Sequence, residues 1–333
     1  MPIKVSFILP CYNVAPYIGR CLESIEHQDI PQEEYEVICV DDCSPDNTGD
    51  VIREYQQRYP NIVYHRHETN KTAGGARNTG IELAKGKYIW FVDPDDAIVS
   101  NVLAGLYAKA KELNTDILFF NKNYINEKGE SRQDIQFADL NEVIPGQQFF
   151  MKYCPNKRLA EVTSVWREIY NRDFCILNGL RYPEIRSSQD VVFAWKAFLL
   201  AQRVSAISDV CYNHFRRPNS TTGSRGRLKA ESAISASLLY PNELLNLIET
   251  LHFDNEVFPN DLRFGIHCAL NDDSRKVFLM DRAERKRFYH IMKEKRVVID
   301  RLRSEMNRKT RLIFEYRMPL LLWLMVIDVL YLK

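Results

Sequence analysis

Apolar runs and helix-spaced apolar residues alternate along the first 120 residues of the chain. Short runs rich in β-branched and aromatic residues suit buried strands, whereas apolar residues three or four positions apart suit helices. Strands are predicted over residues 5–9, 35–40, 62–64, 88–92 and 116–120. Helices are predicted over 15–25, from after residue 46 to about 59, over 74–85 and from about 96 to 113. This alternation favours an α/β fold with a doubly wound, mostly parallel central sheet and helices on both faces.

The pattern changes after residue 120. Residues 121–137 are polar, with a hairpin-like turn at 127–130, and an amphipathic helix is predicted over 191–200. From about residue 223 the spacing is helical, with helices predicted over 228–251, 261–270 and 282–307. We therefore expect an α/β domain over 1–222, with halves of about 1–120 and 121–222, and a helical C-terminal region over 223–333.

Composition narrows the class of protein without identifying it. The chain of 333 residues is 45% hydrophobic and 27% charged, with a net charge of +1. These values are ordinary for a globular protein, and the small net charge gives no sign of a nucleic-acid partner. The eight cysteines include no Cys-x-x-Cys pair, so we expect reduced thiols in a cytoplasmic protein. The first ten residues suit an opening strand better than a signal peptide.

Three aspartates follow the apolar run at 88–92. Asp93, Asp95 and Asp96 surround Pro94, which cannot donate a ladder hydrogen bond and so ends a central strand. Open α/β sheets bind ligands beyond the carboxyl ends of such strands. Carboxylates this close repel one another, and their oxygens are hard ligands, so we expect Mg²⁺ or Mn²⁺ at Asp93 and Asp95. The alternative for Asp96 alone is the N-cap of the helix that follows.

Two other predicted strands end in residues that suit ligand binding. Asp41 or Asp42 can accept hydrogen bonds from a base or a ribose. The alternative for Asp42 is that it only stabilises the turn before Ser44-Pro45. Pro10 and Tyr12 follow the first strand, and Arg77 at a helix start could contact a base or a phosphate, or lie on the surface. Neither Gly-x-Gly-x-x-Gly after the first strand nor Gly-x-x-x-x-Gly-Lys-Ser/Thr occurs, which disfavours dinucleotide oxidoreductases and P-loop enzymes.

Four motifs, in this order, resemble those of the family 2 glycosyltransferases, which have the GT-A fold. The matching segments are Val5-Ser-Phe-Ile-Leu-Pro10-Cys-Tyr12-Asn13, Val40-Asp41-Asp42-Cys-Ser44-x-Asp46, Ala76-Arg77-Asn78-x-Gly80 and Ala84-x-Gly86-x-Tyr88-Ile-x-Phe-x-Asp93-x-Asp95-Asp96. The resemblance implies an inverting transfer of a sugar from a nucleotide sugar, usually a UDP-hexose or UDP-N-acetylhexosamine, to an acceptor hydroxyl. The domain over 1–222 would then be the glycosyltransferase domain.

The resemblance also implies a role for each candidate residue, by its position in these motifs. The Pro10–Tyr12 segment and Asp42 would contact the uracil, and Arg77 would lie beside the nucleotide. Asp93 would reach the ribose and the metal shell. Asp95 would be the direct metal ligand.

Asp190, at the start of the helix predicted over 191–200, is the candidate base. Taken alone, it could be a helix N-cap. The resemblance implies that an acid at this point is the catalytic base, although Gln189 stands where the family often has a second acid. An inverting transfer needs a base within hydrogen-bond reach of the attacking hydroxyl.

The segment from Cys211 to Ser220 resembles the family's tyrosine- and arginine-bearing segment. His214 could complete the metal shell or touch a phosphate, although a structural strand residue is the plainer interpretation. Arg216 or Arg217 could hold the diphosphate, or the two could form a solvated basic pair.

The C-terminal third is basic between residues 282 and 317 and ends in an apolar stretch over 318–332. This stretch is shorter than the about 20 residues that a membrane-spanning helix needs. Basic residues followed by Leu, Trp and Tyr favour a helix in the interface of an anionic membrane, on the inner face of the cell membrane. The alternative is a helix packed on the domain or in a homodimer interface. Membrane contact would suit a lipid-linked acceptor in cell-surface polysaccharide assembly.

Two other functions remain as alternatives. A nucleotidyltransferase that makes sugar nucleotides shares the α/β sheet and the acidic metal site. Such an enzyme needs a Gly-rich, cationic loop after the first strand, where this chain has Pro10-Cys-Tyr-Asn-Val-Ala. A membrane-associated scaffold with a dead transferase domain is disfavoured, because acids stand at every expected position.

Overall fold

The computed structural model describes residues 2–153, 164–216, 230–253, 256–271, 280–307 and 310–311. The chain divides into two compact units, Met1–Glu184 with Phe193–Ser224, and Ile185–Val192 with Arg225–Lys333. In the described part, the first unit contains a central sheet. The second consists of helices together with the short segment 185–192.

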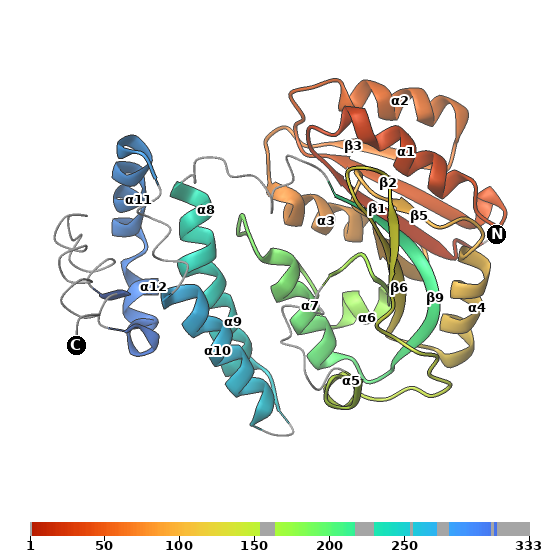
Figure 1. The fold of residues 1–333 in the computed structure, drawn as a ribbon. Helices are drawn as coiled ribbons and strands as arrows, with labels where there is room; N and C mark the ends of the chain where they lie inside the picture. Colours follow the sequence, from red (N-terminus) through yellow and green to blue (C-terminus); the bar gives the residue numbers. More distant parts are fainter. Residues whose placement is uncertain are drawn as a thin grey trace. The chain divides into compact units, whose positions relative to one another are not determined.

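A nine-stranded sheet forms the centre of the first unit, counted over the described residues (Figure 1). The strands are β1 (Val5–Cys11), β2 (Tyr35–Asp41), β3 (Ile62–Arg66), β4 (Tyr88–Phe91), β5 (Ala97–Ile98), β6 (Ile117–Ile125), β7 (Ser131–Asp134), β8 (Glu168–Asn171) and β9 (Val204–Phe215). They lie in the order β3-β2-β1-β4-β8-β6-β9-β5, and β7 pairs with β6. β1, β2, β3, β4, β6 and β9 run in one direction, and β5, β7 and β8 run against it. The predicted α/β fold with a mostly parallel sheet is confirmed.

Helices cover both faces of this sheet (Figure 1). They are α1 (Ala15–Glu26), α2 (Thr48–Arg58), α3 (Thr72–Leu83), α4 (Leu103–Leu113), α5 (Gly146–Tyr153), α6 (Arg172–Leu177) and α7 (Gln189–Leu200). Because successive strand residues point to opposite faces, Phe7 packs in one core with α1, α2 and α4, whereas Ile8 faces α3. A Cβ added to Gly80 of α3 would lie 2.2 Å from the Ile8 side chain. The later part of α3 thus packs directly on the middle of β1.

Pro10 does not end β1, so the predicted strand end is wrong. β1 continues to Cys11, and Pro10 pairs with Val40 of β2. On the other side β4 pairs only with Val5–Ile8 of β1. Pro10, which has no N–H, therefore lies beyond the end of that ladder and leaves no hydrogen bond of the sheet unmade.

The helix predicted from about Asp96 begins later. The residues after Asp96 form β5, which pairs with Tyr212 and Asn213 of β9, and α4 starts at Leu103. The prediction of an N-cap at Asp96 is therefore wrong. The Asp96 carboxylate instead accepts hydrogen bonds from the Tyr212 hydroxyl and the Phe215 N–H, both at 2.8 Å, so it ties this segment to β9.

The second unit is helical where it is described. α8 (Ala230–Ile234) runs through a π-helical turn (Ser235–Leu239) into α9 (Tyr240–Thr250), and α10 (Val257–Asn271), α11 (Arg282–Glu294) and α12 (Arg296–Arg301) follow. The single helix predicted over 282–307 is wrong, because the backbone leaves helical angles at Lys295 (ψ 21°). No helix of the described residues is long and apolar enough to cross a membrane. The stretch 318–332 lies outside the described residues.

Candidate active site

Three neighbouring strands bring the candidate residues to one edge of the first unit. β1 lies between β2 and β4, and the three strands are parallel. Tyr12 follows β1, Asp42 follows β2, and Asp93 comes two residues after the end of β4. Because the carboxyl ends of parallel strands meet at the same edge, the predicted base-contacting and metal-binding segments are neighbours.

Asp93, Asp95 and Asp96 form a compact acidic cluster on this edge. One carboxylate oxygen of each lies within 4.8 Å of the others. Asp96 is buried, and both of its oxygens accept hydrogen bonds from β9. Its burial, and then the charges of Asp93 and Asp95, raise the pKa of Asp96 well above its usual value. Asp96 is therefore a structural acid, and Asp93 and Asp95 are the more exposed pair of the cluster.

Arg77 of α3 pairs with Asp93. Its guanidinium donates to Asp93 Oδ1 at 2.7 Å and lies 5.3 Å from the centre of the Tyr182 ring. The side chain is 8% exposed, so the alternative of a surface arginine is wrong. The Asp93 N–H donates to the Tyr212 hydroxyl at 3.1 Å. Asp93 is thus bonded to α3 through Arg77 and to β9 through Tyr212.

Asp41 is occupied by contacts within the chain. One of its oxygens accepts from the Ser44 N–H at 2.8 Å, and the other accepts from the Tyr64 hydroxyl at 2.9 Å and from Arg66. The residue is fully buried. These contacts hold the turn after β2 and the neighbouring strand β3 together.

Asp42, by contrast, keeps one oxygen without a partner. Its Oδ1 accepts from His67 Nδ1 and from the Lys71 N–H, both at 2.7 Å. His67 Nε2 lies 2.9 Å from the Thr79 hydroxyl, which fits a ring that carries its hydrogen on Nδ1. Asp42 Oδ2 is buried and has no hydrogen-bond partner among the described residues. A buried acceptor without a donor is costly, so this oxygen suits a ligand that brings an N–H group.

The acidic cluster suits a hard divalent cation. Carboxylate oxygens are the ligands that Mg²⁺ and Mn²⁺ take in proteins, and those of Asp93 and Asp95 are the less buried ones here. Arg77 bonds one Asp93 oxygen and leaves the second outside that contact. The residues present therefore fit a metal held by Asp93 and Asp95.

His214 lies in β9 and packs among aromatic rings. Its ring centre is 5.1 Å from that of Trp166 and 5.7 Å from that of Tyr124. Burial, and then the charge of Lys122, lower the pKa of His214. Its Nδ1 is buried without a partner among the described residues. This packing is what we expect of a structural strand residue. A contact between His214 and a metal or a phosphate stays a prediction.

The remaining predicted residues lie further along the chain. Arg216 is exposed just after β9, with its Nε 3.8 Å from Glu127. Asp190 lies in the first turn of α7, one residue inside its start at Gln189, and belongs to the second unit. The predicted N-cap at Asp190 is therefore wrong, because the helix already includes Gln189. Arg217 lies outside the described residues.

Sequence reasoning missed His67 and Thr79, and it gave no role to Tyr212 itself, although the resemblance covers the segment that contains it. His67 directly follows β3, so the rule that gathers parallel strand ends at one edge already places it beside Asp42. Thr79 and Tyr212 give no such signal, because α3 and β9 approach the edge only through the packing of the whole unit.

The described cysteines fit the expectation of reduced thiols. Seven of them are free, and Cys11, Cys21, Cys39, Cys175 and Cys211 are buried. Burial raises the pKa of the Cys11, Cys21, Cys175 and Cys211 thiols. These thiols are therefore poor nucleophiles and poor metal ligands.

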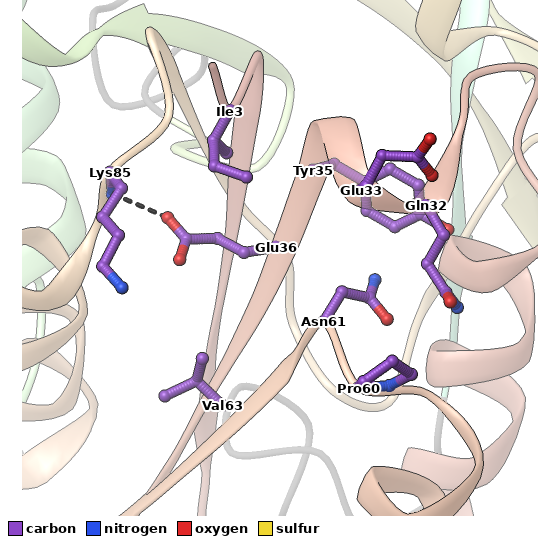
Figure 2. A pocket seen from close by; sticks show the side chains of 9 residues that line it. All are labelled: Ile3, Gln32, Glu33, Tyr35, Glu36, Pro60, Asn61, Val63 and Lys85. Carbon is purple, nitrogen blue, oxygen red and sulfur yellow. Dashed lines mark hydrogen bonds between the residues drawn. The ribbon is translucent and has the colours of Figure 1, made fainter. Parts of the chain in front are cut away.

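A hollow of about 630 Å³ lies at the opposite, amino edge of the sheet (Figure 2). Its lining residues precede or begin β1, β2, β3 and β4: Ile3, Gln32, Glu33, Tyr35, Glu36, Pro60, Asn61, Val63 and Lys85. Glu36 accepts from the Ser6 hydroxyl and from the Lys85 N–H, both at 2.6 Å. Tyr35 and Glu36 are consecutive strand residues and point to opposite faces of β2. The hollow therefore wraps over the strand starts, and it contains none of the predicted site residues.

The parallel strands, the antiparallel β8 beside them and the acidic carboxyl edge define an α/β glycosyltransferase fold of the GT-A type. The chain belongs to glycosyl transferase family 2, whose family model matches residues 6–167. Glycosyltransferase GlyG of Streptococcus pneumoniae is 30% identical over 226 residues, which cover 65% of this chain and 72% of that protein.

Longer relatives extend the comparison. The poly(ribitol-phosphate) β-glucosyltransferase of Bacillus spizizenii is 34% identical over 63% of this chain and 32% of its own length. The poly(ribitol-phosphate) β-N-acetylglucosaminyltransferase TarS of Staphylococcus aureus is 30% identical over 85% of this chain and 48% of its own length. The chain thus spans a third to a half of the length of these relatives. The crystal structure of S. aureus TarS 1–349 with UDP-GlcNAc aligns with a TM-score of 0.66 and 26% identity, covering 94% of this chain and 87% of that one.

Proposed function

We propose that this chain is an inverting transferase that moves a sugar from a UDP-hexose or UDP-N-acetylhexosamine to an acceptor hydroxyl in cell-surface polysaccharide assembly. The observation that carries the proposal is the unpartnered, buried Oδ2 of Asp42 on the same sheet edge as Asp93 and Asp95. The UDP-GlcNAc complex of TarS supports the donor, and the poly(ribitol-phosphate) relatives support a saccharide or polyol-phosphate acceptor.

Uracil is the base that suits this edge. Its imide N–H is a donor, and Asp42 Oδ2 is an acceptor that no described group satisfies. Tyr12, at 50% exposed, follows the adjacent strand end and would cover the base together with the Pro10 segment. Because Oδ2 is closed to water, a neighbouring group must shift before the base can reach it. Asp41, which three groups of the chain already occupy, would support this site from behind.

The diphosphate would lie at the acidic cluster. Asp95 would hold Mg²⁺ or Mn²⁺ directly, and Asp93 would reach both the ion and the ribose. When bound, such an ion neutralises the charge that develops on the diphosphate leaving group. Arg77 would lie beside the nucleotide, where it already orients Asp93, and Arg216 would add a positive charge near the diphosphate.

Asp190 would act as the general base of the transfer. As the acceptor oxygen attacks the anomeric carbon, its proton passes to the Asp190 carboxylate and the bond between that carbon and the UDP oxygen breaks. The electron pair of that bond leaves with UDP. A single displacement inverts the configuration at the anomeric carbon, so no nucleophilic carboxylate is needed.

We also propose a domain organisation, a cellular location and a membrane contact for this chain. They comprise a glycosyltransferase domain over 1–222, a cytoplasmic location on the inner face of the membrane, and membrane contact through 318–332 with a lipid-linked acceptor. The buried free thiols support a reducing compartment. A homodimer that uses the same stretch is the competing arrangement.

The substitution Asp42→Asn tests base recognition with little change in shape. The Asn amide oxygen can still accept from His67 and the Lys71 N–H, but the amide nitrogen would then turn a donor toward the imide N–H of uracil. We expect UDP affinity, measured by calorimetry with Mn²⁺, to fall about 10- to 100-fold, the size of a hydrogen bond to a charged group. N3-methyl-UDP, which lacks the imide hydrogen, should bind the wild type and the variant equally weakly.

Asp50→Asn is the matched control, because Asp50 has a side chain that is 73% exposed and lies in α2. It should leave UDP binding unchanged. Equal affinity of the wild type for UDP and N3-methyl-UDP would contradict the proposed role of Asp42. Transfer or hydrolysis of UDP-GlcNAc, measured in parallel, separates an active transferase from a scaffold with a dead domain.

A further inference from the structure

Lys122 of β6 places a positive charge in a partly buried position, with the largely solvent-exposed Asp134 as its ion-pair partner. Its side chain is 14% exposed, and its Nζ lies 4.8 Å from the centre of the Trp166 ring. Its ion-pair partner Asp134 is 44% exposed and 3.6 Å away, which is longer than a hydrogen bond. Burial, and then the charge of Arg167, lower the pKa of Lys122. An anion at this ammonium would offset the cost of keeping a charge away from water.

A chain of contacts connects Lys122 to the acidic edge. Lys122 pairs in register with Tyr212 of β9, and the Tyr212 hydroxyl accepts from the Asp93 N–H. The Trp166 ring, 4.8 Å from Lys122 Nζ, stacks on Tyr212 and lies 5.1 Å from the His214 ring. Lys122 therefore borders the site at which the donor diphosphate is proposed to bind, on the side of β6 and β9.

Trp166 is a fixed, partly exposed aromatic surface beside this cation. Its ring stacks on Tyr212, with centroids 4.6 Å apart and an angle of 18° between the planes. Its carbonyl accepts from Trp90 Nε1 at 3.0 Å, which ties the segment before β8 to β4. A rigid aromatic ring next to an ammonium group can pack against the carbon chain of a polyol while the ammonium binds a phosphate.

We propose that Lys122 and Trp166 form the acceptor subsite of this transferase and that it recognises a phosphodiester-linked polyol. The phosphate would bind the Lys122 ammonium, and the polyol carbons would pack on Trp166. This inference rests on the proposed function, because it deepens the assignment of the same site. It is supported by the relatives that are named poly(ribitol-phosphate) glycosyltransferases. Lys122 is a specificity residue here and takes no part in the bond changes.

Two acceptors that differ in phosphate test the subsite: a short ribitol-phosphate oligomer and free ribitol, with UDP-GlcNAc as donor. For Lys122→Met we expect the acceptor KM for the oligomer to rise about 10- to 100-fold, the loss expected for a charge-assisted contact. The donor KM, the UDP affinity and the KM for ribitol should stay within about twofold, because none of these involves the acceptor phosphate. Lys122→Arg, which keeps the charge, should retain most of the affinity, and Trp166→Phe should weaken both acceptors.

Lys128→Met, at an exposed position in the turn between β6 and β7, is the matched control and should change nothing. A rise in donor KM or in the dissociation constant of UDP would assign Lys122 to the donor side and overturn the proposal. An equal loss for both acceptors would show a structural role and overturn it as well. If the wild type transferred no sugar, the proposed function would fail. Calorimetric binding of the oligomer to wild type and Lys122→Met would still decide the subsite.

Discussion

Replacing Glu168→Gln should make the stability of the first unit less dependent on pH. Glu168 lies in the central strand β8 and is 1% exposed. One of its oxygens accepts from the Tyr170 hydroxyl at 2.7 Å, and the other is without a hydrogen-bond partner among the described residues. Burial raises the pKa of Glu168 to about 8, and the contacts with Tyr170 and Arg167 offset only part of this effect.

A carboxyl group with a raised pKa binds its proton more tightly in the folded protein than in the unfolded chain, where the reference pKa is 4.5. Its stabilising contribution is therefore fully present below pH 4.5 and is lost as the pH rises through 8. With these two pKa values, the contribution is about 2.7 kcal/mol at pH 6 and about 0.1 kcal/mol at pH 9.

Urea unfolding followed by tryptophan fluorescence at pH 6, 7, 8 and 9 measures this effect. Gln does not titrate and can still accept from Tyr170. The free energy of unfolding of the wild type relative to Glu168→Gln should therefore fall by about 2.6 kcal/mol from pH 6 to pH 9. Glu112→Gln, at a side chain that is 69% exposed, is the control and should show no such trend. A difference that stays constant over this range would refute the raised pKa and the burial argument behind it.

Two predictions address the proposed chemistry. Asp95→Ala should remove the dependence of UDP binding on Mn²⁺, because Asp95 is the proposed direct ligand, and calorimetry with and without the ion checks this. An unchanged affinity in the presence of Mn²⁺ would remove Asp95 from that role. Asp190→Asn should keep UDP binding and lower kcat by about 10²- to 10⁴-fold, the range that a general base contributes. Turnover near the wild-type rate in a single-turnover transfer assay would exclude Asp190 as the base.

The sequence predicts elements well where the local pattern alone decides them. The strands that begin at Val5, Tyr35 and Tyr88 and the turn around Gly129 follow from apolar runs and turn residues, and the structure confirms them. The local pattern could not predict the start of α4, because β5 lies between Asp96 and this helix. β5 forms only by pairing with β9, more than 100 residues later. Propensity near Asp96 favours a helix, and the long-range hydrogen bonds of its carboxylate override that preference.

The same limit applies to the site. Parallel topology brings Tyr12, Asp42 and Asp93 to one edge, and this much follows from the order of strands and helices. Sequence cannot divide the roles of Asp41 and Asp42, because they are adjacent acids after the same strand. Only the folded structure shows that Tyr64 and Arg66 of β3 donate hydrogen bonds to the Asp41 carboxylate. Asp42, in contrast, has a buried oxygen without a partner among the described residues.

The three clustered aspartates have contacts in the fold that reduce their mutual repulsion. Their proximity in sequence suggests that a cation must relieve mutual repulsion, but the fold relieves much of it without one. Both oxygens of Asp96 accept hydrogen bonds from β9, and Arg77 pairs with Asp93 at 2.7 Å. Repulsion among the three carboxylates alone therefore does not require a bound ion. The expectation of a metal depends on Asp95 as its direct ligand. Asp95 belongs to the cluster at the edge where a diphosphate would bring further negative charge. An ion should therefore bind much more tightly with UDP than without it, since the nucleotide supplies the excess charge that the protein has largely neutralised.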